Sequence, residues 1–187
     1  YETMLYSQRR QLHATIGAVL ESRHDKNAGE IVDLLAYHYA RSNERGKALH
    51  YLQQAGQKAL AGYANEAAIS YFDEALSVAK EIKNVKVQYD LLAGRERAYN
   101  RLGNRVAQAQ DLIQMKNLAL NRDDLAQQLE TGNRRLLLAT NLGQYNEAIA
   151  IAKETLALAR RSNQAAGEAR TLTNLGITYW RQGDYGQ

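Results

Sequence analysis

Residues 172–185 read LTNLGITYWRQGDY, and this stretch decides the fold that the sequence predicts. Its first residues have helical spacing, and the following Gly183-Asp184-Tyr185 predicts a tight turn. A helical pattern that ends at a glycine recurs upstream at Gly103 and at Gly143. These three glycines stand 40 residues apart, and a fixed period in this range is the sequence signature of stacked helical repeats.

Composition supports long helices and excludes several kinds of function. The 187 residues include no proline, which would interrupt a helix, and no cysteine, so disulfides and thiolate metal sites are excluded. The net charge of +4 is dispersed over 24 basic and 20 acidic residues, which argues against a nucleic-acid partner. No apolar run approaches the roughly 18 residues that span a membrane, and no signal peptide is visible. We therefore expect a cytoplasmic location and no membrane partner.

Apolar spacing predicts helices over residues 1–23, 30–40, 47–62, 66–80, 85–102, 106–119, 125–142, 145–159 and 165–182. The connections are short, so neighbouring helices should be antiparallel. Asn65 is a candidate N-cap, as are Asp123 and Asp124, whereas nothing in the sequence accounts for Gly94 inside a helix. The predicted fold is an all-α, right-handed superhelix of antiparallel helix pairs with a repeat of about 40 residues. Residues 1–44 should cap the array or link it to an upstream domain, and residues 45–187 should form the repeats.

The repeat resembles the tetratricopeptide repeat. Leu172, Leu175-Gly176 and Tyr179 match the first helix of that motif, and Ala68 and Phe72 match its second helix. The column in which helices should approach closely reads Gly56, Glu96, Leu136 and Gly176, so the middle two units depart from the motif. The resemblance implies that the first helix of each pair lines a concave surface that binds a peptide or a partner protein.

The N-terminal part carries a second resemblance. The segments Arg9–His13, Asp33–Ala36 and Tyr51–Gly56 are similar to the helical region of large bacterial signalling proteins. Those proteins join a class III adenylate or guanylate cyclase domain and an AAA-like ATPase to tetratricopeptide repeats. The resemblance implies that this chain is a regulatory region of such a protein, without its catalytic chemistry.

No motif in the sequence supports catalysis. The histidines His13, His24, His38 and His50 lack metal-ligand spacing, and no phosphate loop, dinucleotide fingerprint or catalytic triad appears. We therefore expect no enzyme activity, no metal and no cofactor in this chain. Paired acids such as Asp123-Asp124 suit the start of a helix.

The resemblance also implies which polar residues of the first helices face the partner. The candidates are Gln53, Gln57, Arg97, Asn100, Arg101, Asn133, Thr140, Asn141, Arg170, Thr173, Asn174, Trp180 and Arg181. Their amides and guanidinium groups suit a peptide backbone and acidic groups, although an ordinary solvated surface would have the same composition. Tyr39, Tyr99 and Tyr179 are instead expected to pack in the core.

The leading functional hypothesis is a protein-interaction and regulatory module of a larger cytoplasmic signalling protein. The alternatives are a small-ligand sensor that controls an attached output domain, and a structural spacer or oligomerisation region. The last predicted helix has no second helix to complete its pair in this sequence. We therefore expect an apolar strip near Leu172, Leu175 and Tyr179 that frays or promotes self-association.

Overall fold

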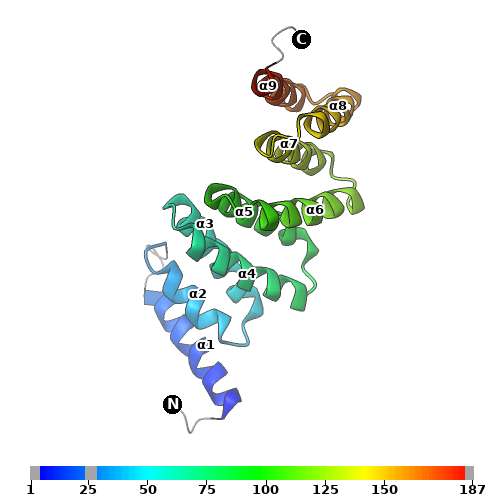
Figure 1. Cartoon of the computed structure of the whole chain (residues 1–187). Helices are drawn as coiled ribbons and strands as arrows, with labels where there is room; N and C mark the ends of the chain where they lie inside the picture. Colours follow the sequence, from blue (N-terminus) through cyan, green and yellow to red (C-terminus); the bar gives the residue numbers. More distant parts are fainter. Residues whose placement is uncertain (1–4, 24–28, 184–187) are drawn as a thin grey trace. The chain divides into compact units, whose positions relative to one another are not determined.

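The structure is a computed structural model that describes residues 5–23 and 29–183. Within these residues it contains nine α-helices and no strand (Figure 1). They are α1 (Tyr6–Arg23), α2 (Val32–Ala40), α3 (Arg45–Ala61), α4 (Asn65–Glu81), α5 (Val85–Leu102), α6 (Arg105–Asn121), α7 (Leu125–Asn141), α8 (Tyr145–Arg161) and α9 (Ala165–Gln182). The predicted helices are confirmed within the described residues, with ends that differ by a few residues, while residues 1–4 of the first predicted helix lie outside them. The predicted break at 24–29 and the predicted turn at 183–185 lie mostly outside the described residues.

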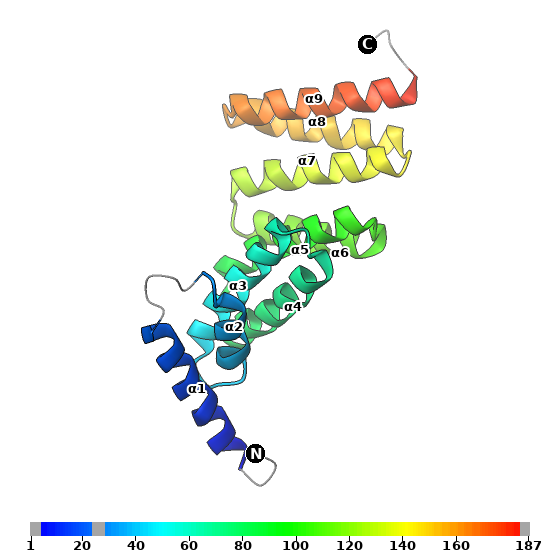
Figure 2. The same cartoon turned by 90° about the vertical axis from the view of Figure 1, so that its left-hand side faces the viewer.

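The helices form two units, residues 1–104 and residues 105–187. In the first unit each helix from α1 to α4 packs on the one that follows it, and α3 also contacts α5. In the second unit each helix from α6 to α8 packs on the one that follows it, and α7 also contacts α9. Figure 2 shows α7, α8 and α9 lying side by side. Each unit is thus a stack of helices in hairpin order, which confirms the predicted all-α, helix-pair architecture.

Two parts of the fold prediction are not tested. The right-handed twist of the array stays a prediction, and so does the division at residue 44 between N-terminal helices and repeats. In the part of the chain that is described, no helix is both long enough and apolar enough to cross a bilayer.

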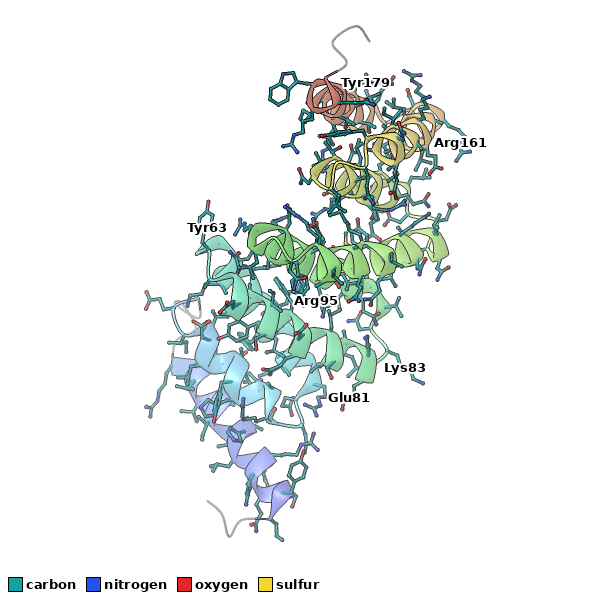
Figure 3. All side chains as sticks on the ribbon, in the orientation of Figure 1. Tyr63, Glu81, Lys83, Arg95, Arg161 and Tyr179 are labelled. Carbon is teal, nitrogen blue, oxygen red and sulfur yellow. The ribbon has the colours of Figure 1, made fainter. Side chains whose placement is uncertain are left out.

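The turns repeat every 20 residues. A left-handed backbone conformation, with φ between 49° and 84°, occurs at Tyr63, Lys83, Gly103, Asp123, Gly143, Asn163 and Gly183. After α3 to α8, the residue that follows this position donates its N–H five residues back, as Ala64 N does to Ala59 O at 2.9 Å. This 6→1 bond is the Schellman motif, which satisfies a carbonyl at the end of the helix. Figure 3 labels Tyr63 and Lys83 at two of these turns.

The two N-cap predictions have different outcomes. Asp124 caps α7, because its carboxylate accepts a hydrogen bond from Gln127 N at 3.0 Å. The prediction for Asn65 is wrong, because α4 begins at Asn65 itself and the cap position belongs to Ala64. The preceding Schellman turn fixes where α4 begins, so no side-chain cap is required there.

Packing against Phe72 explains why a glycine occupies position 94 inside a helix. Phe72 of α4 is 1% exposed and lies between α3 and α5. A Cβ atom on Gly56 of α3 would lie 2.8 Å from the Phe72 ring, and one on Gly94 of α5 would lie 2.5 Å from it. Both glycines therefore make room for the same aromatic ring.

The N-terminal helix is attached through a charged group. Glu21 of α1 accepts hydrogen bonds from Lys47 Nζ at 2.6 Å, Tyr51 OH at 2.5 Å and Tyr39 OH at 2.7 Å. The rings of Tyr39 and Tyr51 stack with centroids 5.3 Å apart. The hydrogen bonds from Lys47 and Tyr51 lower the pKa of Glu21 to about 2. Glu21 therefore connects α1 to both α2 and α3.

The tyrosines expected in the core behave as packing residues. Tyr39 is fully buried, and Tyr99 and Tyr179 are half-buried. Tyr179 is labelled on α9 in Figure 3.

Candidate functional site

The candidate site in the second unit is a face formed by the first helices of its pairs, α7 and α9. The residues Glu130, Arg134, Leu137 and Asn141 lie at helical spacing on one side of α7, and Arg170, Ile177 and Arg181 lie on the matching side of α9. We call these seven residues the α7–α9 face. Each residue of α9 in this set is the counterpart, 40 residues later, of a residue of α7 in it.

Charged side chains on this face are organised around one carboxylate. Glu130 accepts a hydrogen bond from Arg134 Nε at 2.8 Å through one oxygen and pairs with Arg170 Nη1 through the other. Arg181 Nη1 donates to Asn141 Oδ1 at 2.6 Å. The face therefore carries three arginines and one acid, and only Arg134 and Arg170 pair with that acid, which leaves the face net positive. A partner with carboxylate groups would complement this charge.

Two exposed apolar side chains lie among these charges. Leu137 is 38% exposed and Ile177 is 37% exposed. They occupy the position that Gln57 and Arg97 occupy in the first unit, since 57, 97, 137 and 177 are 40 residues apart. The prediction missed both because it selected polar residues only. The 40-residue column through Arg97 was the sequence signal that identifies them.

A pocket opens at one end of the face. Its volume is about 200 Å³, and Glu130, Asn133 and Arg170 are among the residues that line it. Drug-sized ligands generally occupy pockets of about 300–1,000 Å³, so this pocket suits a single side chain better than a whole metabolite.

Three of the predicted binding residues are not available on the surface. Asn133 and Asn174 are 2% and 7% exposed, and Asn174 Nδ2 donates to Asn133 Oδ1 at 2.9 Å. Thr140 is 2% exposed, and its hydroxyl lies 2.8 Å from that of Thr178. The expectation that these residues are exposed is wrong, because they lie between α7 and α9 and join the two helices. We call these two hydrogen-bonded pairs the polar seam.

Trp180 and Thr173 are exposed, and Thr173 lies at helical spacing from Arg170 and Ile177, whereas Trp180 lies mainly on another side of α9. Trp180 is 65% exposed and shares a helical stripe with Leu172 and Gly176. The structure therefore brings together Asn141, Arg170 and Arg181 from the predicted set and separates Trp180 from them.

In the first unit, the predicted residues lie on α3 and α5. Gln57, Arg97 and Asn100 are exposed, whereas Gln53 is half-buried. Arg101 is exposed, but its guanidinium donates to Leu60 O at 2.5 Å. That guanidinium also lies 4.6 Å from the centroid of the Tyr63 ring. Arg101 thus stabilises the C-terminal end of α3, where carbonyls lack helical partners.

Two further cavities lie between α6, α7 and α8, among residues of α7 other than those of the α7–α9 face. Their volumes are about 150 Å³ and about 360 Å³, and Arg135 lines both. The larger one is lined by apolar residues such as Leu112, Leu138 and Ile151, together with the charged Arg135 and Glu147. Among the described residues, no group of three His, Cys, Asp or Glu side chains is placed to hold a metal ion.

Comparison with known proteins gives one family match. Residues 136–187, which include α8 and α9, match the model of the tetratricopeptide repeat. The matched segment contains Leu137, Asn141, Arg170, Ile177 and Arg181 of the α7–α9 face. No curated protein matches the sequence.

Proposed function

We propose that this chain is a protein-interaction module that holds a segment of a partner protein against the first helices of its repeats. Tetratricopeptide repeats are non-catalytic units that generally mediate contacts between proteins, and stacked repeats present extended binding surfaces. The observation that carries the proposal is the α7–α9 face, where exposed Leu137 and Ile177 lie among three arginines.

The chemistry of this face defines the partner. An apolar side chain would cover Leu137 and Ile177, and acidic side chains would approach Arg134, Arg170 and Arg181. The pocket beside Glu130 would take one further side chain. The partner segment is therefore an apolar and acidic peptide.

Selection from a phage-displayed library of random twelve-residue peptides tests this proposal. We expect the enriched peptides to combine acidic and apolar residues. Binding of a synthetic peptide, measured by fluorescence anisotropy, should weaken at least tenfold in Ile177→Asp.

Val106→Asp is the matched control, because Val106 is an equally apolar exposed residue of α6, outside the face. It should bind the peptide as the unchanged protein does. Failure to enrich any peptide would overturn the proposal, and so would equal weakening in Val106→Asp.

We further propose that the module is the regulatory region of a larger cytoplasmic bacterial signalling protein with cyclase and ATPase domains. The support is the resemblance of segments Arg9–His13, Asp33–Ala36 and Tyr51–Gly56 to such proteins. Sequencing the reading frame on both sides of this chain tests it. A flanking cyclase or ATPase domain is the expected result, and unrelated flanking sequence would contradict it.

A small-ligand sensor is the second candidate, favoured by the cavity of about 360 Å³ between α6, α7 and α8. Its volume suits a small metabolite, and its lining suits one that has an apolar body and a polar group beside Arg135 or Glu147. Thermal stabilisation by such a metabolite, abolished by Leu138→Trp, would support this function. If neither peptides nor metabolites bind, the chain is a structural spacer.

A further inference from the structure

An arginine lines the cavity of about 360 Å³ between α6, α7 and α8. This residue, Arg135 of α7, has a counterpart 40 residues earlier in Arg95 of α5. Arg95, which is labelled in Figure 3, pairs with Asp73 of α4. The residue of α6 that corresponds to Asp73 is Ile113, which lines the cavity. The acid that neutralises Arg95 therefore has no counterpart beside Arg135.

The other charged residues near Arg135 do not neutralise it. Glu147 lines the same cavity, and Glu154 lines the neighbouring cavity of about 150 Å³ together with Lys116. Among the described residues, neither glutamate forms an ion pair or a hydrogen bond with Arg135. Both glutamates are exposed, whereas Arg135 is half-buried. A half-buried guanidinium without an acid is stabilised when an anion reaches it.

A second difference between the two units leaves room beside this arginine. Tyr99 lies one turn after Arg95 on α5, and its ring centroid is 5.9 Å from the Arg95 guanidinium carbon. The residue of α7 that corresponds to Tyr99 is Ala139, which is 4% exposed and lines the cavity. In the second unit, the position next to Arg135 therefore carries a methyl group in place of a tyrosine ring.

The remaining lining of the cavity is mostly apolar, with Gln144 and Glu147 as its other polar residues. Leu112 comes from α6, Leu138 from α7 and Ile151 from α8, and all three are buried. A volume of about 360 Å³ lies within the range that small-molecule ligands occupy. An arginine binds a carboxylate through two parallel hydrogen bonds, and the apolar residues suit a hydrocarbon body.

We propose that this cavity binds a small carboxylate with an apolar body. The carboxylate lies against the Arg135 guanidinium, as Asp73 lies against Arg95 in the first unit, and the apolar body fills the space beside Ala139. This ligand class deepens the second proposed function, the small-ligand sensor, and rests on it. It is independent of peptide binding, because Arg135 is not a residue of the α7–α9 face.

Two kinds of metabolite share this chemistry, simple carboxylates and apolar α-amino acids. Hydrocinnamate and L-phenylalanine have the same apolar body and the same carboxylate, and only the amino acid carries an ammonium group. Glu147 is the acid of the cavity that would bind this ammonium. Tighter binding of L-phenylalanine, lost in Glu147→Gln, assigns the site to amino acids, and tighter binding of hydrocinnamate assigns it to simple carboxylates. Either result supports the proposal.

Isothermal titration calorimetry of the whole chain with three compounds tests the proposal. Hydrocinnamate has the apolar body and the charge, hydrocinnamide has the same body without the charge, and acetate has the charge without the body. We expect hydrocinnamate to bind at least tenfold more tightly than either of the others. The reason is that it alone contacts both the Arg135 guanidinium and the apolar lining.

Three variants locate the binding. Arg135→Gln should weaken hydrocinnamate at least tenfold and leave hydrocinnamide unchanged. Ile113→Asp should do the same, because it restores beside Arg135 the acid that the first unit has. Ile113 is 58% exposed, so this substitution should leave the fold intact, as circular dichroism would verify. Arg161→Gln is the matched control and should change nothing, because Arg161 is an exposed arginine of α8 that lines neither cavity.

Two results would overturn the proposal and leave the sensor function standing. One is binding of hydrocinnamide as tight as that of hydrocinnamate, and the other is binding of hydrocinnamate that Ile113→Asp leaves unchanged or that Arg161→Gln weakens equally. If none of the compounds binds at millimolar concentration, the proposal and the sensor function of this cavity both fail. Peptide binding to the α7–α9 face is measured separately, by fluorescence anisotropy.

Discussion

At the scale of single residues, a large side chain on one helix packs against small residues on a neighbouring helix. Phe72 is accepted by two glycines on different helices, while Leu136 shares its cluster with Ala152. Sequence alone predicts a glycine at a close approach such as Gly56 from the repeat pattern. It does not predict Gly94, because the reason for that glycine is a ring 22 residues away on another helix.

Two glycine substitutions should therefore have opposite effects on stability. Gly94→Ala should lower the free energy of unfolding by about 1–2 kcal/mol, because its Cβ would overlap a buried ring that has no room to move. Gly176→Ala should raise it by up to about 1 kcal/mol, the helix preference of alanine, because its surroundings are open. Urea unfolding followed by circular dichroism measures both. Equal shifts of the two unfolding midpoints would contradict the packing role that we assign to Gly94.

Glu21 should make stability depend on pH. Its pKa in the folded protein is lowered from 4.5 to about 2, so its contribution is present above pH 4.5 and is lost as the pH falls toward 2. Glu21→Gln should cost about 2 kcal/mol at pH 7, the order of a lost hydrogen bond to a charged group. The difference between the two proteins should shrink between pH 4.5 and 2. A difference independent of pH would show that Glu21 does not act through its charge.

At the scale of the element, the helix and its Schellman turn form a 20-residue unit. The sequence revealed only the glycines Gly103, Gly143 and Gly183, and so gave a period of 40. The other turns have the same left-handed conformation at Tyr63, Lys83, Asp123 and Asn163. These residue types do not predict a left-handed conformation as glycine does. Helix existence and approximate ends were predictable because the apolar spacing is regular. The turn type at non-glycine residues was not.

Lys83 has a positive φ of 55°, which is unfavourable for a residue with a Cβ. Lys83→Gly should therefore stabilise the chain by about 0.5–1 kcal/mol, since glycine adopts this conformation without strain. Asn163→Gly is the control and should change stability less, because asparagine tolerates φ of this sign. Thermal unfolding of both variants measures the effect. Destabilisation by Lys83→Gly would contradict the equivalence of the turns.

The element scale also explains why the binding residues were only partly predictable. The 40-residue period predicts which side of each first helix a residue lies on. It does not distinguish residues that are exposed on that side from residues that contact the neighbouring first helix. Asn133 and Asn174 fall in the second group and bond to each other. Arg181 and Asn141 remain exposed at the edge of the contact.

At the scale of the whole molecule, each unit of the chain is a stack of helices, and the binding surface that we propose lies on the first helices of the pairs in the second unit. The described residues hold no candidate metal cluster, and the α7–α9 face combines two exposed apolar side chains with three arginines.

The most direct test of this account is a methyl NMR titration of the chain with a peptide selected from the phage library. The account predicts that the signals of Leu137 and Ile177 shift most, while those of Val106 and Ile113 on α6 stay in place. The largest shifts on α6, with Leu137 and Ile177 unchanged, would contradict it.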